Sequence, residues 1–230
     1  MKFYHEILDK LRNGVPYKFS RWGDGEWGCM YGVTGENRDG NEYLPELGVS
    51  LRGILNSEPK YYMGLQYGVL YNERLRDYVF GKIFKLDINW VNGDILHQAS
   101  EYGHLKEFVN ALKSNCNRII YIGADYFKEL SFIDVHIKTP DANSFNHNDD
   151  IMKEIEVYVP DPKRCIVGSV TGSLPMEVYL VSAAMNSNVI IDKLPDNVTA
   201  IDIGSVFDPY LGRPRASYQH KMNVKFNDLW

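Results

Sequence analysis

The chain has 230 residues and a formal net charge of −5, and 44% of its residues are hydrophobic. This length suits one α/β domain with a sizeable core. No stretch approaches the ~18 consecutive apolar residues of a membrane span, and the acidic balance argues against a general nucleic-acid-coating surface. The N-terminal residues lack the apolar segment of a secretory signal, so a cytoplasmic protein is expected.

The sequence contains three cysteines, Cys29, Cys116 and Cys165, which are odd in number and widely spaced. No pair has the close spacing of a zinc or redox motif, so neither a disulfide framework nor a zinc site is expected. The six histidines are also scattered, and there is no Gly-x-Ser-x-Gly motif. The signatures of zinc proteases and of serine hydrolases are therefore missing.

The first half of the chain mixes helical and strand patterns. Apolar residues at helical spacing before Gly14 predict an N-terminal helix, and the apolar run after it predicts a short buried strand. The elements expected here are a helix over 2–13, a strand over Val15–Phe19 that ends at Arg21, a polar loop over 32–42, a helix around 44–55, a strand over Tyr61–Leu65, and mainly helical structure over 71–113 with an interruption near Asn89–Gly93.

The second half alternates between strands and helices. The elements expected here are strands over Arg118–Gly123, Phe132–Ile137, Cys165–Gly168 and Ala200–Gly204, a short helix after Gly123, and helices over Asp149–Val157 and Leu174–Met185. Such alternation predicts an α/β fold with a mostly parallel sheet and helices on both faces. We expect residues 1–230 to form a single domain, with a helical excursion around 71–113 and a basic tail over 211–230.

The segment after the first strand, Arg21-Trp-Gly-Asp-Gly-Glu26, holds the densest chemistry in the sequence. Because ligands bind beyond the carboxyl ends of the strands in such sheets, this glycine-rich segment is expected to be a loop shaped around a ligand. Asp24 and Glu26 can converge on a hard cation, Mg²⁺ or Mn²⁺. The flat ring of Trp22 can stack on a base or sugar ring, and the Arg21 guanidinium can bind a phosphate through two parallel hydrogen bonds. The alternative interpretation is that this segment, including Gly23, is an ordinary glycine-rich turn in which Asp24 and Glu26 are solvated and bind no ligand.

A second glycine-rich turn, Gly168-Ser-Val-Thr-Gly-Ser173, follows the strand predicted at Cys165–Gly168. Its backbone N–H groups and its hydroxyls can hold a diphosphate at a helix N-terminus. The residues that would do so are Gly168, Thr171, Gly172 and Ser173. The motif is neither a Walker A motif nor a Gly-x-Gly-x-x-Gly fingerprint, and Thr171 or Ser173 can equally serve as a helix cap.

Carboxylates also follow the last predicted strand, in Asp202-Ile-Gly-Ser-Val-Phe-Asp208. A general base beside an acceptor hydroxyl requires such a group, so Asp202 and Asp208 are candidate catalytic residues and Gly204 a candidate binding residue. Asp202 can instead cap a neighbouring turn, and Asp208 can open one before Pro209.

Two further polar features have binding and structural interpretations. Asn143 follows a predicted strand and can read a base or ribose edge, although a loop asparagine often bonds its own backbone. The tail is locally basic and suits a phosphate or an anionic acceptor, or is a solvated extension. Its basic residues are Arg213, Arg215, His220, Lys221 and Lys225.

The segment Arg21–Glu26 resembles the R-[FW]-G-D-G-E signature of the GT-D-type glycosyltransferases. The later motifs follow in the order of that family, and the similarity spans most of residues 15–210. These motifs are Ile122-Gly123 at a strand end, Pro140 with Asn143–Phe145 before a helix, a glycine-rich strand–helix turn, and Ala200–Gly204.

The resemblance implies a Rossmann-like fold, a nucleotide-sugar donor such as UDP-glucose, and a divalent metal held by Asp24 and Glu26 with Arg21 nearby. Gly123, Asn143 and the Gly168–Ser173 turn would line the donor pocket. The chain departs from the family at this turn, which more usually reads Gly-Pro-Thr-Ala, and after Gly204, where the best-known member is more acidic.

The resulting hypothesis is a metal-dependent glycosyltransferase that moves a hexose from a UDP-hexose to an acceptor hydroxyl with inversion. Asp208 is the first candidate for the base. The acceptor would be a glycan or glycoprotein, or a nucleic-acid base. The alternatives are a non-catalytic nucleotide-sugar binding protein and a metal-dependent nucleotide phosphoesterase.

Overall fold

The computed structural model describes residues 2–37, 39–80, 88–159 and 176–229. Its helices are α1 (Lys2–Arg12), α2 (Asp24–Tyr31), α3 (Pro45–Asn56), α4 (Tyr67–Leu70), α5 (Glu73–Phe80), α6 (Ile95–Glu101), α7 (Leu105–Asn115), α8 (Asn148–Glu156) and α9 (Asn186–Lys193). Its strands are β1 (Lys18–Trp22), β2 (Tyr62–Leu65), β3 (Trp90–Asn92), β4 (Arg118–Gly123), β5 (Val135–Lys138), β6 (Glu177–Ser182) and β7 (Thr199–Asp202). Short 3₁₀ helices lie at Asp125–Glu129, Ser144–His147, Asp208–Leu211, Gln219–Lys221 and Phe226–Leu229.

The described strands form one seven-stranded sheet in the order β3-β2-β1-β7-β6-β4-β5. Every strand pair is parallel, and the central strands β1 and β7 pair Phe19 with Ile201. The α/β class and the parallel sheet predicted from the sequence are therefore confirmed. Because the strands are parallel, all of their carboxyl ends lie at one edge of the sheet.

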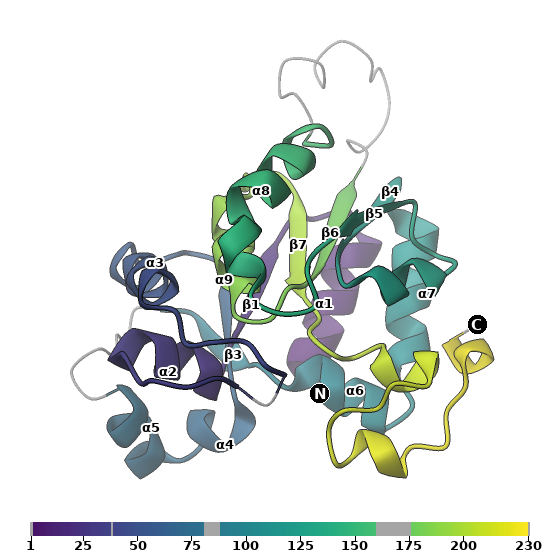
Figure 1. The fold of residues 1–230 in the computed structure, drawn as a ribbon. Coiled ribbons are helices and arrows are strands. Elements are labelled where there is room, and N and C mark those ends of the chain that lie inside the picture. The colour runs from purple at the N-terminus through teal and green to yellow at the C-terminus, as the bar shows by residue number, and fades with distance from the viewer. Residues whose placement is uncertain (1, 38, 81–87, 160–175, 230) are drawn as a thin grey trace.

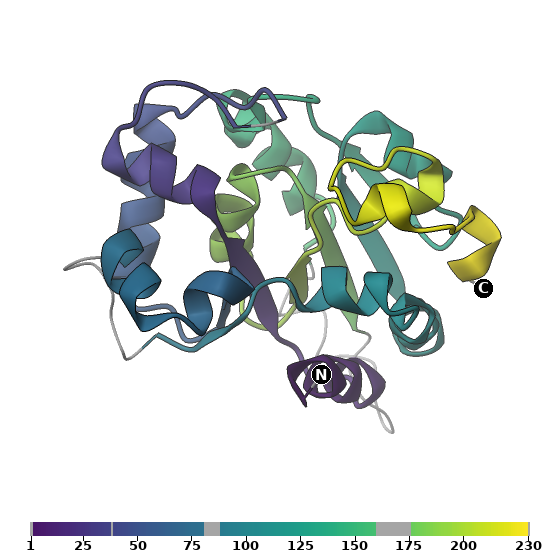
Figure 2. The ribbon, with the colours of Figure 1, turned by 90° about the horizontal axis from the view of Figure 1, so that it is seen from below.

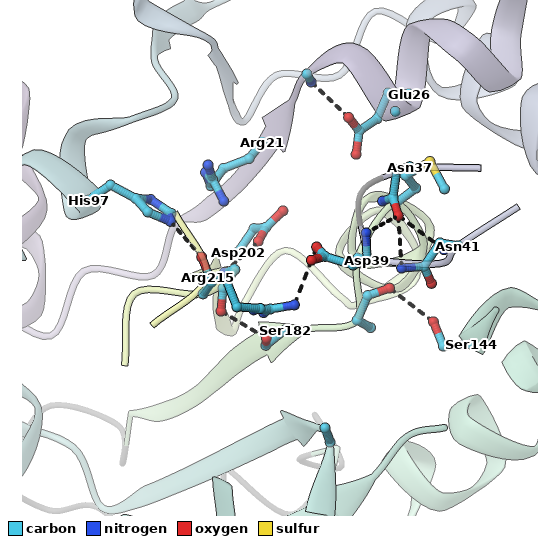
Figure 3. Close-up of a pocket in the computed structure, with 18 of the residues that line it drawn as sticks. Arg21, Glu26, Asn37, Asp39, Asn41, His97, Ser144, Ser182, Asp202 and Arg215 are labelled. Carbon is cyan, nitrogen blue, oxygen red and sulfur yellow. Dashed lines mark hydrogen bonds and ion pairs between the residues drawn. The ribbon is translucent and has the colours of Figure 1, made fainter. Parts of the chain in front are cut away.

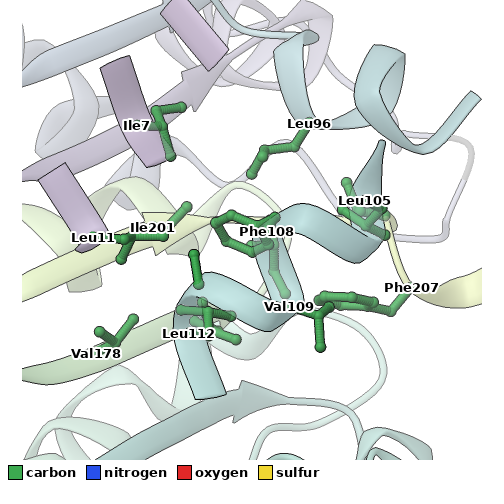
Figure 4. Packing of buried hydrophobic residues seen from close by; sticks show 14 of the residues in the cluster. Ile7, Leu11, Leu96, Leu105, Phe108, Val109, Leu112, Val178, Ile201 and Phe207 are labelled. Atoms are coloured by element: carbon green, nitrogen blue, oxygen red, sulfur yellow. The ribbon is translucent and has the colours of Figure 1, made fainter. Parts of the chain in front are cut away.

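Helices cover both faces of the sheet (Figures 1 and 2). One face carries α1, α6 and α7, and α1 packs directly against α7. Figure 4 shows the apolar stripe of α7, which includes Phe108 and Leu112, pressed against Ile201 of β7. The other face carries α8 and α9. Burying a side chain such as Phe108 stabilises the fold by about 1.5–3 kcal/mol.

Helix α2, which begins at Asp24, is fixed by close packing on α3. Gly48 of α3 lies against the backbone of α2, and a Cβ atom there would overlap the carbonyl oxygen of Cys29. Only glycine allows the two helices to approach this closely. The position of Asp24 and of the first turn of α2 therefore depends on this contact.

The structure overturns the helix predicted over Leu174–Met185. Within the described residues, Glu177–Ser182 is strand β6, and a helix follows only at Asn186–Lys193. The run from Val178 to Val181 is buried on both sides, so it lacks the alternation that marks a half-buried strand. A short apolar run of this kind does not distinguish a strand from a helix. The predicted strand over Cys165–Gly168 lies outside the described residues.

Two other sequence-based interpretations change. The segment that contains Asp24 and Glu26 is the first turn of α2 rather than a loop. The basic tail is not a solvated extension, because it folds back on the body of the molecule (yellow in Figure 2) and Leu229 is buried in the main core cluster. Among the described residues, no helix combines the length and apolar character needed to cross a bilayer.

Gly48→Ala should destabilise the protein by about 1–3 kcal/mol, because the added methyl group forces α2 and α3 apart. Gly53→Ala is the matched control, since Gly53 lies in the same helix with open space around its Cβ position and alanine favours a helix by roughly 0.5–1 kcal/mol. Urea unfolding of both variants checks this expectation. Equal stability of the two variants would contradict the packing described for α2.

Candidate functional site

A cavity of about 570 Å³ opens at the carboxyl edge of the sheet. Each of the seven described strands contributes a residue from its carboxyl end or from just beyond it. These residues are Arg21 (β1), Gly64 (β2), Gly93 (β3), Ala124 (β4), Thr139 (β5), Ser182 (β6) and Asp202 (β7). Polar side chains from other segments complete the wall (Figure 3). The cavity therefore lies where ligands bind in parallel α/β folds.

Glu26 lines this cavity from the first turn of α2, but its carboxylate turns back to the start of the helix. Oε2 accepts a hydrogen bond of 2.7 Å from the Gly23 backbone N–H, as in a capping box. Oε1 accepts one of 3.3 Å from Asn188 Nδ2. Burial, with a smaller contribution from the nearby Asp202, raises the pKa of Glu26 to about 7 against the opposing effects of the Gly23 hydrogen bond and of Arg21. Glu26 is thus a helix-capping acid that gains a proton near neutral pH.

Asp24 also lines the cavity, and its side chain is exposed there. Its Oδ1 accepts a local hydrogen bond of 3.1 Å from the Gly25 N–H. Among the described residues, no group of three or more carboxylate, histidine or cysteine side chains is close enough to enclose a metal ion. The donor set therefore does not form a closed cage. Mg²⁺ commonly takes only one or two carboxylates and completes its shell with water and substrate phosphate, and Asp24 is the exposed carboxylate at this cavity that could hold such an ion.

Asp202, the second candidate for the base, also lies at this edge. It is 5% exposed and borders the cavity at the end of β7. Burial raises its pKa to about 6, against the opposing effects of Arg21 and of a 3.0 Å hydrogen bond from the Gly204 N–H. A carboxylate with this pKa is still ionised at neutral pH and is a stronger base than an exposed aspartate.

Arg21 brings a cation to the same wall. Its Nε donates a 2.8 Å hydrogen bond to the Gly93 carbonyl, and its Nη2 lies 3.6 Å from Asp94. Gly204 has a φ of +46°, and a Cβ atom there would overlap Arg21 Nη1. The positive φ favours glycine at this position, and a larger residue would also displace the tip of the Arg21 side chain. Gly23, which precedes α2, also borders the cavity.

His97 reaches the cavity from α6, and no sequence motif identified it. Its Nε2 lies 3.3 Å from Ser205 Oγ, and its Nδ1 is buried without a hydrogen-bond partner in the described structure. Burial, and then the positive charges of Arg21 and Arg215, hold the pKa of His97 well below its usual value. The imidazole is therefore neutral at physiological pH.

The structure does not place Asp208, the first candidate for the base, at the cavity. Asp208 is fully buried. Its carboxylate pairs with the Arg215 guanidinium and accepts a 3.1 Å hydrogen bond from the Tyr126 hydroxyl. Asp208 is the first residue of the 3₁₀ helix Asp208–Leu211, and its buried carboxylate holds Arg215 and Tyr126, which themselves line the cavity.

The Trp22 ring is likewise not available as a stacking surface. It is 1% exposed and stacks on Trp27 at a centroid distance of 5.7 Å. Its Nε1 donates a 2.9 Å hydrogen bond to Ser20 Oγ. The ring packs in the core cluster shared with α2 and α3, so its faces are covered although Trp22 borders the cavity.

Two other predicted binding residues lie beside the cavity without lining it. Asn143 has a φ of +53°, and its Oδ1 accepts a 2.7 Å hydrogen bond from the Glu42 N–H. Its own N–H donates to Asn41 Oδ1 at 2.9 Å, so Asn143 fixes the 32–42 loop. At Gly123, a Cβ atom would meet the Tyr121 ring at 2.7 Å. Gly168, Thr171, Gly172 and Ser173 lie outside the described residues.

The remaining wall comes from the polar loop over 32–42 and from the basic tail, for which the sequence suggested a phosphate or an anionic acceptor without placing it at this edge. The 32–42 loop contributes Asn37, Asp39 and Asn41, and the C-terminal tail contributes Arg213 and Arg215. Figure 3 shows Asp39 and Arg215 facing each other in the cavity. These segments are polar and lack a regular pattern, so only the tertiary structure brings them together.

The buried Glu26 predicts a specific pH dependence of stability. With a pKa of about 7 in the folded protein against the usual 4.5, folding takes up a proton between these pH values. The free energy of unfolding should therefore fall as the pH rises through this range, and Glu26 contributes about 2–3 kcal/mol of that fall. Glu26→Gln should remove this contribution, whereas the contribution of Asp202, whose pKa burial also raises, should remain. Urea unfolding of both proteins from pH 4.5 to 7.5 measures it. An identical pH slope in the two proteins would show that Glu26 is not desolvated.

No family model matches this sequence, and no curated protein matches it significantly. Solved structures do match. A structure of the domain of unknown function 1792, described as having a distinct glycosyltransferase fold, is 18% identical, with a TM-score of 0.58 over 96% of this chain and 88% of that one. A structure described as a new glycosyltransferase from Streptococcus sanguinis is 13% identical, with a TM-score of 0.60 over 96% and 91% of the two chains. The chain therefore has the fold of these glycosyltransferase structures, as the resemblance of its motifs predicted.

Proposed function

We propose that this protein is a metal-dependent glycosyltransferase that moves a hexose from a UDP-hexose to an acceptor hydroxyl. The observation that carries the proposal is the position of Asp24 and Asp202 on one cavity at the carboxyl edge of this fold. The cavity is large enough for a nucleotide sugar, since ligand pockets typically measure about 300–1,000 Å³. The UDP-hexose donor is proposed from the likeness of Arg21–Glu26 to the GT-D signature.

Asp24 is the protein ligand that we propose for Mg²⁺ or Mn²⁺, because its carboxylate is exposed at the cavity. Glu26 would stabilise the turn that presents Asp24, through its hydrogen bond to Gly23. A bound divalent cation would neutralise the negative charge that develops on the departing diphosphate. Arg21 would orient the donor from the end of β1, where its guanidinium is already held by Gly93 and Asp94.

Asp202 is the general base that we propose in place of Asp208. Its carboxylate borders the cavity, and its pKa of about 6 suits removal of a proton from an acceptor hydroxyl near neutral pH. The hydrogen bond from the Gly204 N–H fixes its Oδ1, and Oδ2 would accept the proton. Attack by this hydroxyl on the face of the anomeric carbon opposite the diphosphate would invert the configuration.

The donor is tested first by thermal denaturation with UDP-, GDP-, CMP- and dTDP-sugars, each with Mn²⁺ and with EDTA. A ligand that binds only the native state raises the melting temperature by mass action. We expect one UDP-hexose to raise it with Mn²⁺ and not with EDTA. No shift with any nucleotide sugar, in a protein that unfolds cooperatively, would contradict the proposal.

Transfer and hydrolysis of the stabilising donor are then measured in Asp24→Asn and Asp202→Asn. Asp202→Asn should lower kcat by about 10²–10⁴-fold with donor binding retained, because it removes only the proton acceptor. Asp24→Asn should abolish the effect of Mn²⁺ on binding. Asp150→Asn, an exposed position on α8, is the charge-matched control.

The outcomes separate this proposal from its alternatives. Donor binding without transfer or hydrolysis with any acceptor would indicate a non-catalytic nucleotide-sugar binding protein. Release of phosphate or of a nucleoside monophosphate without sugar transfer would indicate a phosphoesterase. Metal-dependent turnover that persists in both variants would contradict the roles given to Asp24 and Asp202.

A further inference from the structure

The C-terminal tail brings two guanidinium groups to the cavity, those of Arg213 and Arg215. Arg213 lies over the Tyr126 ring, with 4.5 Å from its Cζ to the ring centroid. The Tyr126 hydroxyl and the Arg215 Nε both bond Asp208. One buried carboxylate therefore organises a patch in which two arginines flank a tyrosine.

Arg215 is held from one side by buried groups. Besides the bond to Asp208, its backbone N–H donates a 2.8 Å hydrogen bond to Gln219 Oε1. Gln219 is 1% exposed, and its Nε2 donates a 2.7 Å hydrogen bond to the Ser205 carbonyl. The backbone and the Nε side of Arg215 are thus fixed before any ligand arrives, which lowers the entropy cost of binding one.

The Nη1 side of the Arg215 guanidinium pairs with Asp39, a partner that another anion can replace. Its Nη1 lies 3.3 Å from the Asp39 carboxylate, and the two side chains are 38% and 40% exposed. Asp39 belongs to the 32–42 loop, where its N–H donates a 3.0 Å hydrogen bond to Asn37 Oδ1. A half-exposed ion pair of this kind contributes little to stability. A stronger anion can therefore replace Asp39 without disturbing the fold.

We propose that Arg213 and Arg215 form a phosphate-binding subsite and that Asp39 occupies the place of the ligand's phosphate in the free protein. Guanidinium groups suit this role because their fork matches phosphate oxygens. Arg213 has no carboxylate within salt-bridge distance in the described part of the chain, so its charge is available. The inference rests on the proposed function in placing the ligand in this cavity, and it requires no group transfer.

Phosphate binding at this subsite exchanges one anion for another at Arg215. As the phosphate oxygens take Nη1, Asp39 is released, and with it the contact that joins the 32–42 loop to the tail. Asp39 therefore competes directly with the ligand, and its removal favours binding.

The test is isothermal titration of the full chain. Inorganic pyrophosphate and inorganic phosphate are titrated in EDTA, which separates this subsite from a metal, and UDP and uridine are titrated with Mn²⁺, on which donor binding is expected to depend. Asp39→Asn removes the competitor and should bind pyrophosphate roughly two- to fivefold more tightly, the range expected for an exposed ion pair. Arg213→Gln should bind pyrophosphate several-fold more weakly, because it removes one of the two guanidinium groups. The fold should be unaffected, since Arg213 is exposed and its loss leaves no buried charge unpaired. Asp150→Asn should equal the parent protein, which controls for a change in net charge.

The panel also identifies the source of the phosphate. If the subsite holds the donor's diphosphate, Asp39→Asn strengthens binding of UDP and pyrophosphate and leaves uridine unchanged. If it holds a phosphate of the acceptor, pyrophosphate and phosphate respond while UDP does not.

Equal pyrophosphate binding in the parent, Asp39→Asn and Arg213→Gln would overturn the subsite whatever the transfer assays show. A response to Asp39→Asn in a protein without transferase activity would keep the subsite and reject the proposed function.

Discussion

The parallel direction of every described strand is the constraint on which the rest of the structure depends. It places all the carboxyl ends at one edge, so residues more than 180 positions apart, such as Arg21 and Asp202, meet at one cavity. The close approach of α2 to α3 at Gly48 then fixes the position of Asp24, at the start of α2, relative to that edge. Burial of carboxylates there raises the pKa values of Glu26 and of Asp202 toward neutral pH, so both groups can exchange a proton near physiological pH.

Much of the fold and part of the site could be predicted because their signals are local. Alternating strands and helices identify a parallel sheet, and glycine and acidic residues after a strand identify its functional edge. Arg21, Asp24 and Asp202 were predicted in this way to lie at that edge, and the structure places all three on the cavity. The likeness to glycosyltransferase-fold structures agrees with the motif order read from the sequence.

The remaining features depend on tertiary packing. Asp208 and Trp22 look like ligand-binding residues in the sequence, but both are buried, one in an ion pair and one in a core cluster. His97, Asp39 and Arg215 carry no motif, because a helix, a loop and the tail bring them to the cavity only after folding. A buried strand also reads like a helix when neither of its faces is polar, as the error at Glu177–Ser182 shows.

Hydrogen–deuterium exchange with the nucleotide sugar that gives the largest thermal shift, in the presence of Mn²⁺, tests the central claim most directly. A ligand in the cavity should slow exchange at Arg21–Glu26, at 202–205 and at 213–215 together, because these segments share its wall. Exchange along the second cavity, which α3, α8 and α9 border, should not change. Protection confined to that second cavity, with none at the carboxyl edge of the sheet, would contradict the assignment of the active site.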